Sequence, residues 1–187
     1  MCGVFGIWGH SEASNMAYLG LHALQHRGQE SAGIASSDGE RLFAHRAMGL
    51  VQACFSTREL AELKGSASIG HVRYSTAGSS HIKNAQPLAV DYAHGSIALA
   101  HNGNLTNHEA LRSELEAKGT IFQSGTDTET IVHLFSRSSE ATVEDRIVDA
   151  LRKVEGAYSL LLLSEKKLVA VRDPMGLRPL VLGRMMR

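Results

Sequence analysis

Hydrophobic residues alternate with small or polar ones at both ends of the chain, and this two-residue period predicts β-strands there. Two of these stretches are expected to be hairpins; in the first, the turn signal Asp38-Gly39 separates two strand-like runs. The predicted strands and hairpins are 2–9, 31–49, 66–72, 95–101, 157–173 and 176–183. Residues 73–87 are polar and show little periodicity, so we expect a long functional loop in that segment.

Apolar residues recur every three or four positions in other parts of the chain, which predicts amphipathic helices. Ser56 and Glu59 have the spacing of a capping box, and the helix that they begin is expected to stop at Gly65, as the first helix stops at Gly28. The predicted helices are 11–28, 56–65, 107–119, 126–138 and 142–156. Strands toward both ends with helices grouped between them predict an α+β layered sandwich, with antiparallel sheets inside and helices on the outer faces. A parallel nucleotide-binding fold is not expected, because no predicted strand leads into a glycine-rich phosphate turn.

Composition narrows the class of protein further. The 187 residues fit a single domain, 1–187, and 19 Lys and Arg balance 19 Asp and Glu, so we expect neither nucleic acid nor an anionic membrane as a partner. No apolar stretch approaches the roughly 20 residues of a membrane span, and the start lacks the pattern of a signal peptide. Cys2 and Cys54 are too few for a disulfide scaffold, which favours a reducing, cytoplasmic location. His22 and His26 have the spacing of a metal-binding pair, but no second pair follows, and we expect no metal site.

Cys2 directly follows the initiator methionine. If Met1 is removed, one residue carries both a thiol and a free α-amine. An amine of pKa about 7.7 to 8.0 is partly neutral near pH 7, so it can accept the proton of a thiol whose pKa is about 8.5. Nucleophile and base then share one residue, as in N-terminal threonine enzymes. The alternative is a structural or incidental cysteine at the tip of a strand.

Asn102 and Gly103 lie in the stretch "AHNGNLTN", where a predicted strand leads toward a helix. A side-chain amide and an unobstructed backbone N–H are the parts of an oxyanion hole, in which the loss of one donor costs about 100- to 1000-fold in rate. The alternative is an ordinary Asn-Gly turn.

Arg73 and Asp127 could together hold a free amino acid. A guanidinium at a strand end can grip a carboxylate with two parallel hydrogen bonds, and a carboxylate at a helix start can bind an ammonium group. The alternative for Asp127 is a helix cap without another role. Arg27 and Gly28 could likewise be no more than a helix stop.

Several short motifs occur in a fixed order along the whole chain. They are "MCGVFGIWG", "LQHRGQESAGI", "GHVRYSTAG", "LAHNGNLTN", "TDTE" and "RDPMGLRPLVLG". In this order they resemble the glutaminase domain of the class II glutamine amidotransferases, the N-terminal nucleophile group. Among its branches, the resemblance is to the one that begins purine synthesis, rather than to glucosamine-6-phosphate synthase or asparagine synthetase.

The resemblance implies a four-layer αββα sandwich and a set of roles. Cys2 would attack the side-chain carboxamide of L-glutamine, and Asn102 with Gly103 would stabilise the oxyanion. A γ-glutamyl thioester and ammonia would form, and water would release glutamate. Arg73 matches the arginine that holds the α-carboxylate of glutamine, and Asp127 the aspartate that holds its α-ammonium.

Further expectations follow from the same resemblance. Arg27 and Gly28 match a motif that lines the site near the nucleophile. The segment 74–87, which includes the expected substrate contact Thr76, matches a loop that closes over glutamine. Members of this branch continue into a phosphoribosyltransferase domain, for which Mg²⁺ is expected, whereas residues 1–187 show no acidic phosphoribosylpyrophosphate-binding motif and are expected to need no cofactor of their own. The longer proteins are expected to be homo-oligomers.

Two other functions compete with the glutaminase interpretation. One is a catalytically silent glutaminase-like module that serves regulation or assembly. The other is an N-terminal-nucleophile hydrolase of a different amide, against which Arg73 and Asp127 argue, because a clamp for a zwitterion is wasted on a peptide or acyl amide.

Overall fold

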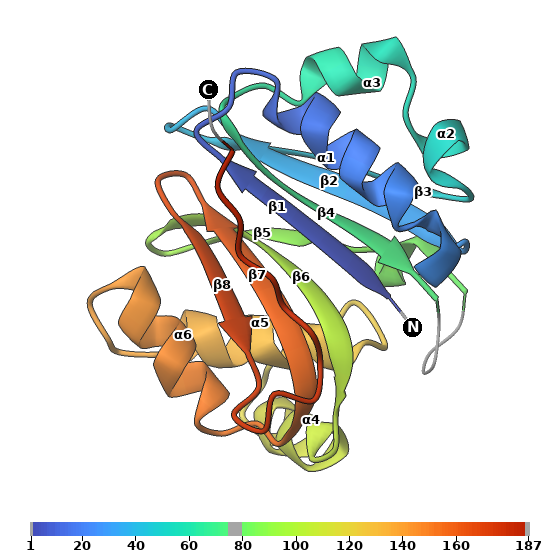
Figure 1. Cartoon of the computed structure of the whole chain (residues 1–187). Coiled ribbons are helices and arrows are strands. Elements are labelled where there is room, and N and C mark those ends of the chain that lie inside the picture. Colours follow the sequence, from blue (N-terminus) through green and yellow to red (C-terminus); the bar gives the residue numbers. More distant parts are fainter. Residues whose placement is uncertain (1, 75–79, 186–187) are drawn as a thin grey trace.

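Two four-stranded antiparallel sheets pack face to face in the computed structural model, which describes residues 2–74 and 80–185 (Figure 1). The first sheet has the order β1-β4-β2-β3 and the second the order β5-β6-β7-β8. The strands of the first sheet are β1 (Gly3–Trp8), β4 (Ala67–Arg73), β2 (Ser31–Ser37) and β3 (Leu42–Met48). Those of the second are β5 (Leu88–Tyr92), β6 (Gly95–Leu105), β7 (Gly156–Ser164) and β8 (Leu168–Arg172).

Helices cover the outer face of each sheet (Figure 1). Those over the first sheet are α1 (Ala13–Ala23), α2 (Val51–Cys54) and α3 (Thr57–Glu62). Those over the second are α4 (His108–Ala117), α5 (Asp127–Arg137) and α6 (Val143–Leu151). Two 3₁₀ turns, η1 (Gln25–Arg27) and η2 (Ile82–Asn84), lie between these elements along the chain. The predicted αββα order of layers is confirmed.

Each interface between layers has its own apolar core. Residues such as Leu21 and Ile34 fill the space under α1 to α3, and Phe135 and Leu160 belong to the core under α4 to α6. The core between the two sheets is rich in alanine, with Ala98 and Ala100 among its members. Small side chains allow two sheets to approach closely, which brings polar groups of β4 within reach of β6.

Most of the predicted elements form. The hairpin around Asp38-Gly39 and the second hairpin are present as β2–β3 and β7–β8. Ser56 and Glu59 make the capping box, with the Ser56 N–H donating to the Glu59 carboxylate at 2.8 Å. None of the helices in residues 2–74 and 80–185 has the length and apolar character of a membrane span.

Several features differ from the prediction. Residues 176–183 are not a strand: Leu182 is 95% exposed, and the Arg172 guanidinium donates to carbonyls of the segment instead. The strand β5 and the short helix α2 were not predicted, because five and four residues carry too little periodicity. The segment 73–87 is not all irregular loop, since η2 lies in it and Asn84 and Gln86 are buried.

His71 links the two sheets. Its Nε2 donates to the backbone oxygen of His101 at 3.0 Å, so β4 is joined to β6 across the alanine-rich core. Burial lowers the pKa of His71 to about 4. The ring is therefore neutral at pH 7, with its proton on Nε2.

We expect this neutral histidine to make stability depend on pH. In the unfolded chain His71 titrates near pH 6.5, so its contribution is complete above that pH and is lost as the pH falls toward 4. The loss approaches about 3 kcal/mol of unfolding free energy, since each tenfold change in a protonation equilibrium corresponds to about 1.4 kcal/mol. Urea unfolding at pH 7.5, 6 and 5 should show a shallower pH dependence for His71→Gln, which keeps a donor for His101. The exposed His94→Gln serves as control, and an unchanged dependence in His71→Gln would contradict this account.

Candidate active site

Cys2 immediately precedes β1, beside the end of β4 (Figure 1). Gly3 pairs with Val72, so extending the antiparallel register by one residue places Cys2 opposite Arg73. The Sγ atom lies 3.8 Å from the backbone oxygen of Tyr74, and the side chain is half-buried. The thiol therefore stands at the edge of the first sheet, where the segment 74–87 begins.

Arg27 and Gly28 lie beside Cys2, in the neighbouring turn. The Nε of Arg27 donates to the backbone oxygen of Cys2 at 2.9 Å. Helix α1 ends earlier than predicted, at Ala23, and η1 completes the path to Gly28. Gly28 has an extended φ of −162°, and a Cβ atom there would lie 2.7 Å from the backbone carbon and oxygen of Arg73. Glycine is thus required by close approach of two backbones, and not by a left-handed turn.

Arg73 is the last residue of β4 and is only 4% exposed. Its Nη1 forms an ion pair with the carboxylate of Glu30, the residue just before β2. Sequence reasoning missed Glu30. No local sequence signal placed it beside Arg73, because that proximity comes from the pairing of β2 with β4, in which Ser31 lies opposite Arg73.

Asn102 and Gly103 lie within β6 and not in a turn, because β6 continues to Leu105. In an antiparallel strand, alternate N–H groups point to the same edge. The N–H of His101 donates to Gln86 Oε1 at 2.7 Å and that of Leu105 donates to Asp127 Oδ2 at 2.9 Å. Gly103 lies between them and points the same way.

Among the described residues, no strand pairs with that edge of β6 at Gly103. The pairing of β6 with β5 runs only as far as Leu88 opposite Leu99, so β5 does not reach Gly103. On the other side, the Thr106 N–H donates to the backbone oxygen of Glu155, in line with the β6–β7 pairing. The N–H groups of even-numbered residues in this stretch therefore point toward β7, and those of odd-numbered residues point away from it. The Gly103 N–H therefore points away from β7, to the same edge as the N–H groups of His101 and Leu105.

Asp127 is the first residue of α5, but it does not cap that helix, whose N-cap residue is Thr126. Its carboxylate instead accepts from Leu105 and lies 3.4 Å from Nδ1 of His101. Burial alone would raise the pKa of Asp127, but the contacts with His101 and Leu105 outweigh it and hold the pKa below its usual value. Asp127 is therefore an anion at neutral pH, as an ammonium partner must be.

A buried polar network holds this half of the site, and sequence reasoning did not identify it. Gln86 accepts from the backbone of His101 and donates to Thr128 Oγ1 at 2.9 Å. Nδ1 of His101 is 3.0 Å from the same hydroxyl. The network fixes His101, the residue just before Asn102, and Asn102 is itself buried.

The site therefore has two halves on two sheets. Cys2, Arg27, Gly28 and Arg73 adjoin at the end of the first sheet, and Asn102, Gly103 and Asp127 adjoin on the second. The His71–His101 hydrogen bond connects them, only two residues before Arg73 and one before Asn102. Thr76 and the rest of 75–79 lie outside the described residues, so the predicted contact of Thr76 stays a prediction.

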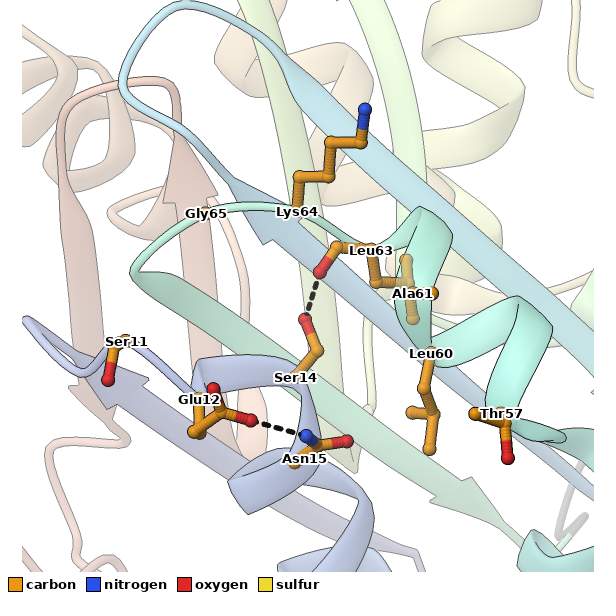
Figure 2. A pocket seen from close by; sticks show the side chains of 10 residues that line it. All are labelled: Ser11, Glu12, Ser14, Asn15, Thr57, Leu60, Ala61, Leu63, Lys64 and Gly65. Carbon is orange, nitrogen blue, oxygen red and sulfur yellow. Dashed lines mark hydrogen bonds between the residues drawn. The ribbon is translucent and has the colours of Figure 1, made fainter.

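Two surface cavities lie elsewhere. One, of about 350 Å³, is formed by the start of α1 and by α3 with the residues that follow it (Figure 2). Its Ser14 hydroxyl donates to the Leu63 carbonyl and its Asn15 amide to the Glu12 carboxylate, so these polar groups already have partners. The other, of about 540 Å³, adjoins Tyr92 and Glu165. Neither is lined by a predicted site residue. Within the described part of the chain, no cluster of three or more His, Cys, Asp or Glu could hold a metal ion.

Comparison with known proteins identifies the family to which the chain belongs. The model of the glutamine amidotransferase domain family matches residues 71–186, more than half of the sequence. The chain therefore belongs to this family, and the fold is that of its N-terminal-nucleophile members.

The named relatives are amidophosphoribosyltransferases. The enzyme of Bacillus subtilis is 51% identical over 185 residues, which cover 98% of this chain and 39% of the relative. The chloroplastic amidophosphoribosyltransferase 2 of Arabidopsis thaliana is 53% identical, over 98% of this chain and 33% of the relative. The solved glutamine phosphoribosylpyrophosphate amidotransferase of B. subtilis, complexed with ADP and GMP, matches with a TM-score of 0.92 and 48% identity, over 99% of this chain and 40% of the other. The chain thus spans about a third to two fifths of the length of these relatives.

Proposed function

We propose that this domain hydrolyses the side-chain amide of L-glutamine to glutamate and ammonia, with Cys2 as the nucleophile. The observation that carries the proposal is the pairing of two half-sites. A thiol and a buried arginine meet at the end of the first sheet, and on the second the N–H edge of β6 that β5 does not reach lies beside an ionised aspartate. An amide substrate with a free α-amino acid group needs these four parts.

The first step forms a covalent intermediate. After removal of Met1, the α-amine of Cys2 accepts the thiol proton, and the sulfur attacks the carboxamide carbon of glutamine. Charge develops on the carboxamide oxygen, where the Asn102 amide and the Gly103 N–H donate to it. When the tetrahedral intermediate collapses, the C–N bond breaks. The leaving nitrogen takes the proton from the α-ammonium of Cys2 and departs as ammonia.

The second step regenerates the enzyme. Water attacks the γ-glutamyl thioester and loses a proton to the α-amine, the C–S bond breaks, and glutamate leaves while the thiol regains its proton. Arg73 and Asp127 hold the α-carboxylate and α-ammonium through both steps. Because Arg73 and Asp127 would recognise these two charged groups, an amide substrate that lacks them is disfavoured. The alternative of a catalytically silent module is disfavoured because all the candidate catalytic and binding residues are present.

The relatives suggest the fate of the ammonia. We propose that, in a longer protein, a phosphoribosyltransferase domain in the same chain uses it to convert phosphoribosylpyrophosphate to phosphoribosylamine, the first step of purine synthesis. Mg²⁺ is expected in that domain, and the whole protein is expected to be a homo-oligomer. The glutaminase domain itself is proposed to need no cofactor and to bind neither nucleic acid nor membrane. We propose a cytoplasmic location, which fits two free thiols, although some relatives are chloroplastic.

Intact mass tests the glutaminase proposal. The chain is weighed before and after treatment with 6-diazo-5-oxo-L-norleucine, a glutamine analogue that alkylates a nucleophile with loss of N₂. We expect a mass without Met1 and a single adduct, located on Cys2. A chain that keeps Met1 and gains no adduct contradicts the proposal and favours the silent module.

Asp127→Asn should weaken glutamine binding. Asparagine keeps an acceptor for the Leu105 N–H but loses the charge that pairs with the α-ammonium. We expect KM to rise about 10- to 100-fold with little change in kcat, the scale of one charged hydrogen bond. Steady-state ammonia release measures both constants. The exposed Asp91→Asn on β5 is the matched control, and an unchanged KM for Asp127→Asn would remove the ammonium role.

A further inference from the structure

The ion pair between Glu30 and Arg73 lies at the site and has no part in the chemistry described so far. The two side chains are 15% and 5% exposed, respectively. The Glu30 backbone is fixed on both sides, because its N–H donates to the Arg73 oxygen at 3.1 Å and its own oxygen accepts from Gly49 at 2.8 Å. The Glu30 carboxylate is thus presented from a rigid position.

A guanidinium as buried as that of Arg73 needs a defined orientation to recognise a carboxylate. Its five N–H donors lie in one plane, so two-point recognition works only when that plane faces the ligand. A charge-assisted hydrogen bond to Nη1 restricts rotation of the group and so fixes the directions in which its other N–H donors point. Glu30 also compensates the buried positive charge before substrate arrives.

We propose that Glu30 is a positioning residue, which orients the Arg73 guanidinium toward the α-carboxylate of glutamine. The inference rests on the proposed glutaminase function. A purely structural role is disfavoured by the strand pairing itself: β2 and β4 are already joined from Ser31–Arg73 to Ser37–Ala67, so the carboxylate is not needed to align them.

Glu30→Gln tests the inference, because glutamine keeps the shape and an acceptor while it removes the charge. The concentration and time dependence of alkylation by 6-diazo-5-oxo-L-norleucine gives a half-saturating concentration and a limiting rate. We expect the half-saturating concentration to rise about tenfold, the scale of one charge-assisted hydrogen bond, with the limiting rate within about twofold of wild type. Glu62→Gln, which breaks an exposed pair with Arg58, is the matched control and should change neither.

Two glutamine fragments separate positioning of Arg73 from general damage. Glutaramate keeps the carboxylate and lacks the α-ammonium, whereas 4-aminobutanamide keeps an ammonium and lacks the carboxylate. In protection assays, Glu30→Gln should weaken glutaramate about tenfold and leave 4-aminobutanamide unchanged. Glu30→Asp, which retains the charge, should recover most of the glutaramate affinity.

Each other outcome overturns a stated claim. Equal weakening of both fragments shows a structural role, and tighter glutaramate binding shows that Glu30 competes for Arg73. Normal alkylation of wild type with no shift in Glu30→Gln removes the positioning role alone. Failure of the wild-type chain to be alkylated overturns the proposed function and, with it, this inference.

Discussion

Cys2→Ala is expected to lower glutamine hydrolysis by about 10⁴-fold or more, because no other group can form the thioester. Alanine removes the thiol but keeps the α-amine at position 2, so the variant tests the nucleophile without removing the proposed base. Among the described residues, the hydrogen bond of the Sγ atom is a long one of 3.8 Å to the Tyr74 oxygen, and we expect the unfolding free energy to stay within about 0.5 kcal/mol of wild type. Ammonia release and urea unfolding measure the two effects separately.

Cys54→Ala is the matched control for Cys2→Ala. Burial raises the pKa of the Cys54 thiol, which donates to the carbonyls of Ala47 and Gly49 under α2 and is therefore a poor nucleophile. Its replacement should cost some stability and leave turnover intact. Residual hydrolysis by Cys2→Ala at a tenth of the wild-type rate would remove Cys2 from the nucleophilic role.

Asn102→Ala is expected to lower kcat about 100- to 1000-fold, while KM changes little, because an oxyanion donor acts mainly in the transition state. The Gly103 N–H would remain, directed by the bonds of His101 and Leu105 on either side of it. Steady-state ammonia release over a range of glutamine concentrations separates the two constants.

Asn104→Ala is the control for the oxyanion prediction. Asn104 is exposed, two residues further along β6, and its substitution removes an equal amide without touching the proposed hole. We expect wild-type kinetics from it. A result in which Asn102→Ala raises KM alone would assign Asn102 to ground-state binding.

The layered fold could be predicted because its signals are local. The Asp38-Gly39 turn signal predicts the hairpin around it, and the Ser56–Glu59 capping box predicts the start of the helix that follows; both form as expected. Residues 176–183 show the limit of such signals. Their apolar pattern predicts a strand, but a strand also needs backbone pairing with a neighbour; the carbonyls of Gly176 and Arg178 accept from the Arg172 guanidinium instead, and Leu182 lies exposed to solvent.

The candidate site could be predicted as a set of residues but not as a geometry. From the sequence alone, the motif around Asn102 and Gly103 is also compatible with a turn. The pairing register of β6 shows that it is a strand and which way the Gly103 N–H points. Glu30 is one of many charged residues in the sequence. Its pairing with Arg73 depends on the contact between β2 and β4, which no local pattern contains.

The division of the proposed site between two sheets makes its assembly depend on how the two sheets pack together. An incompletely folded chain in which one sheet has formed carries either a thiol without an oxyanion hole or an oxyanion hole without a thiol. Under the proposed mechanism, the two halves come together only when the alanine-rich interface closes and His71 reaches His101. The same mechanism predicts no ammonia release from a chain in which only one sheet has formed.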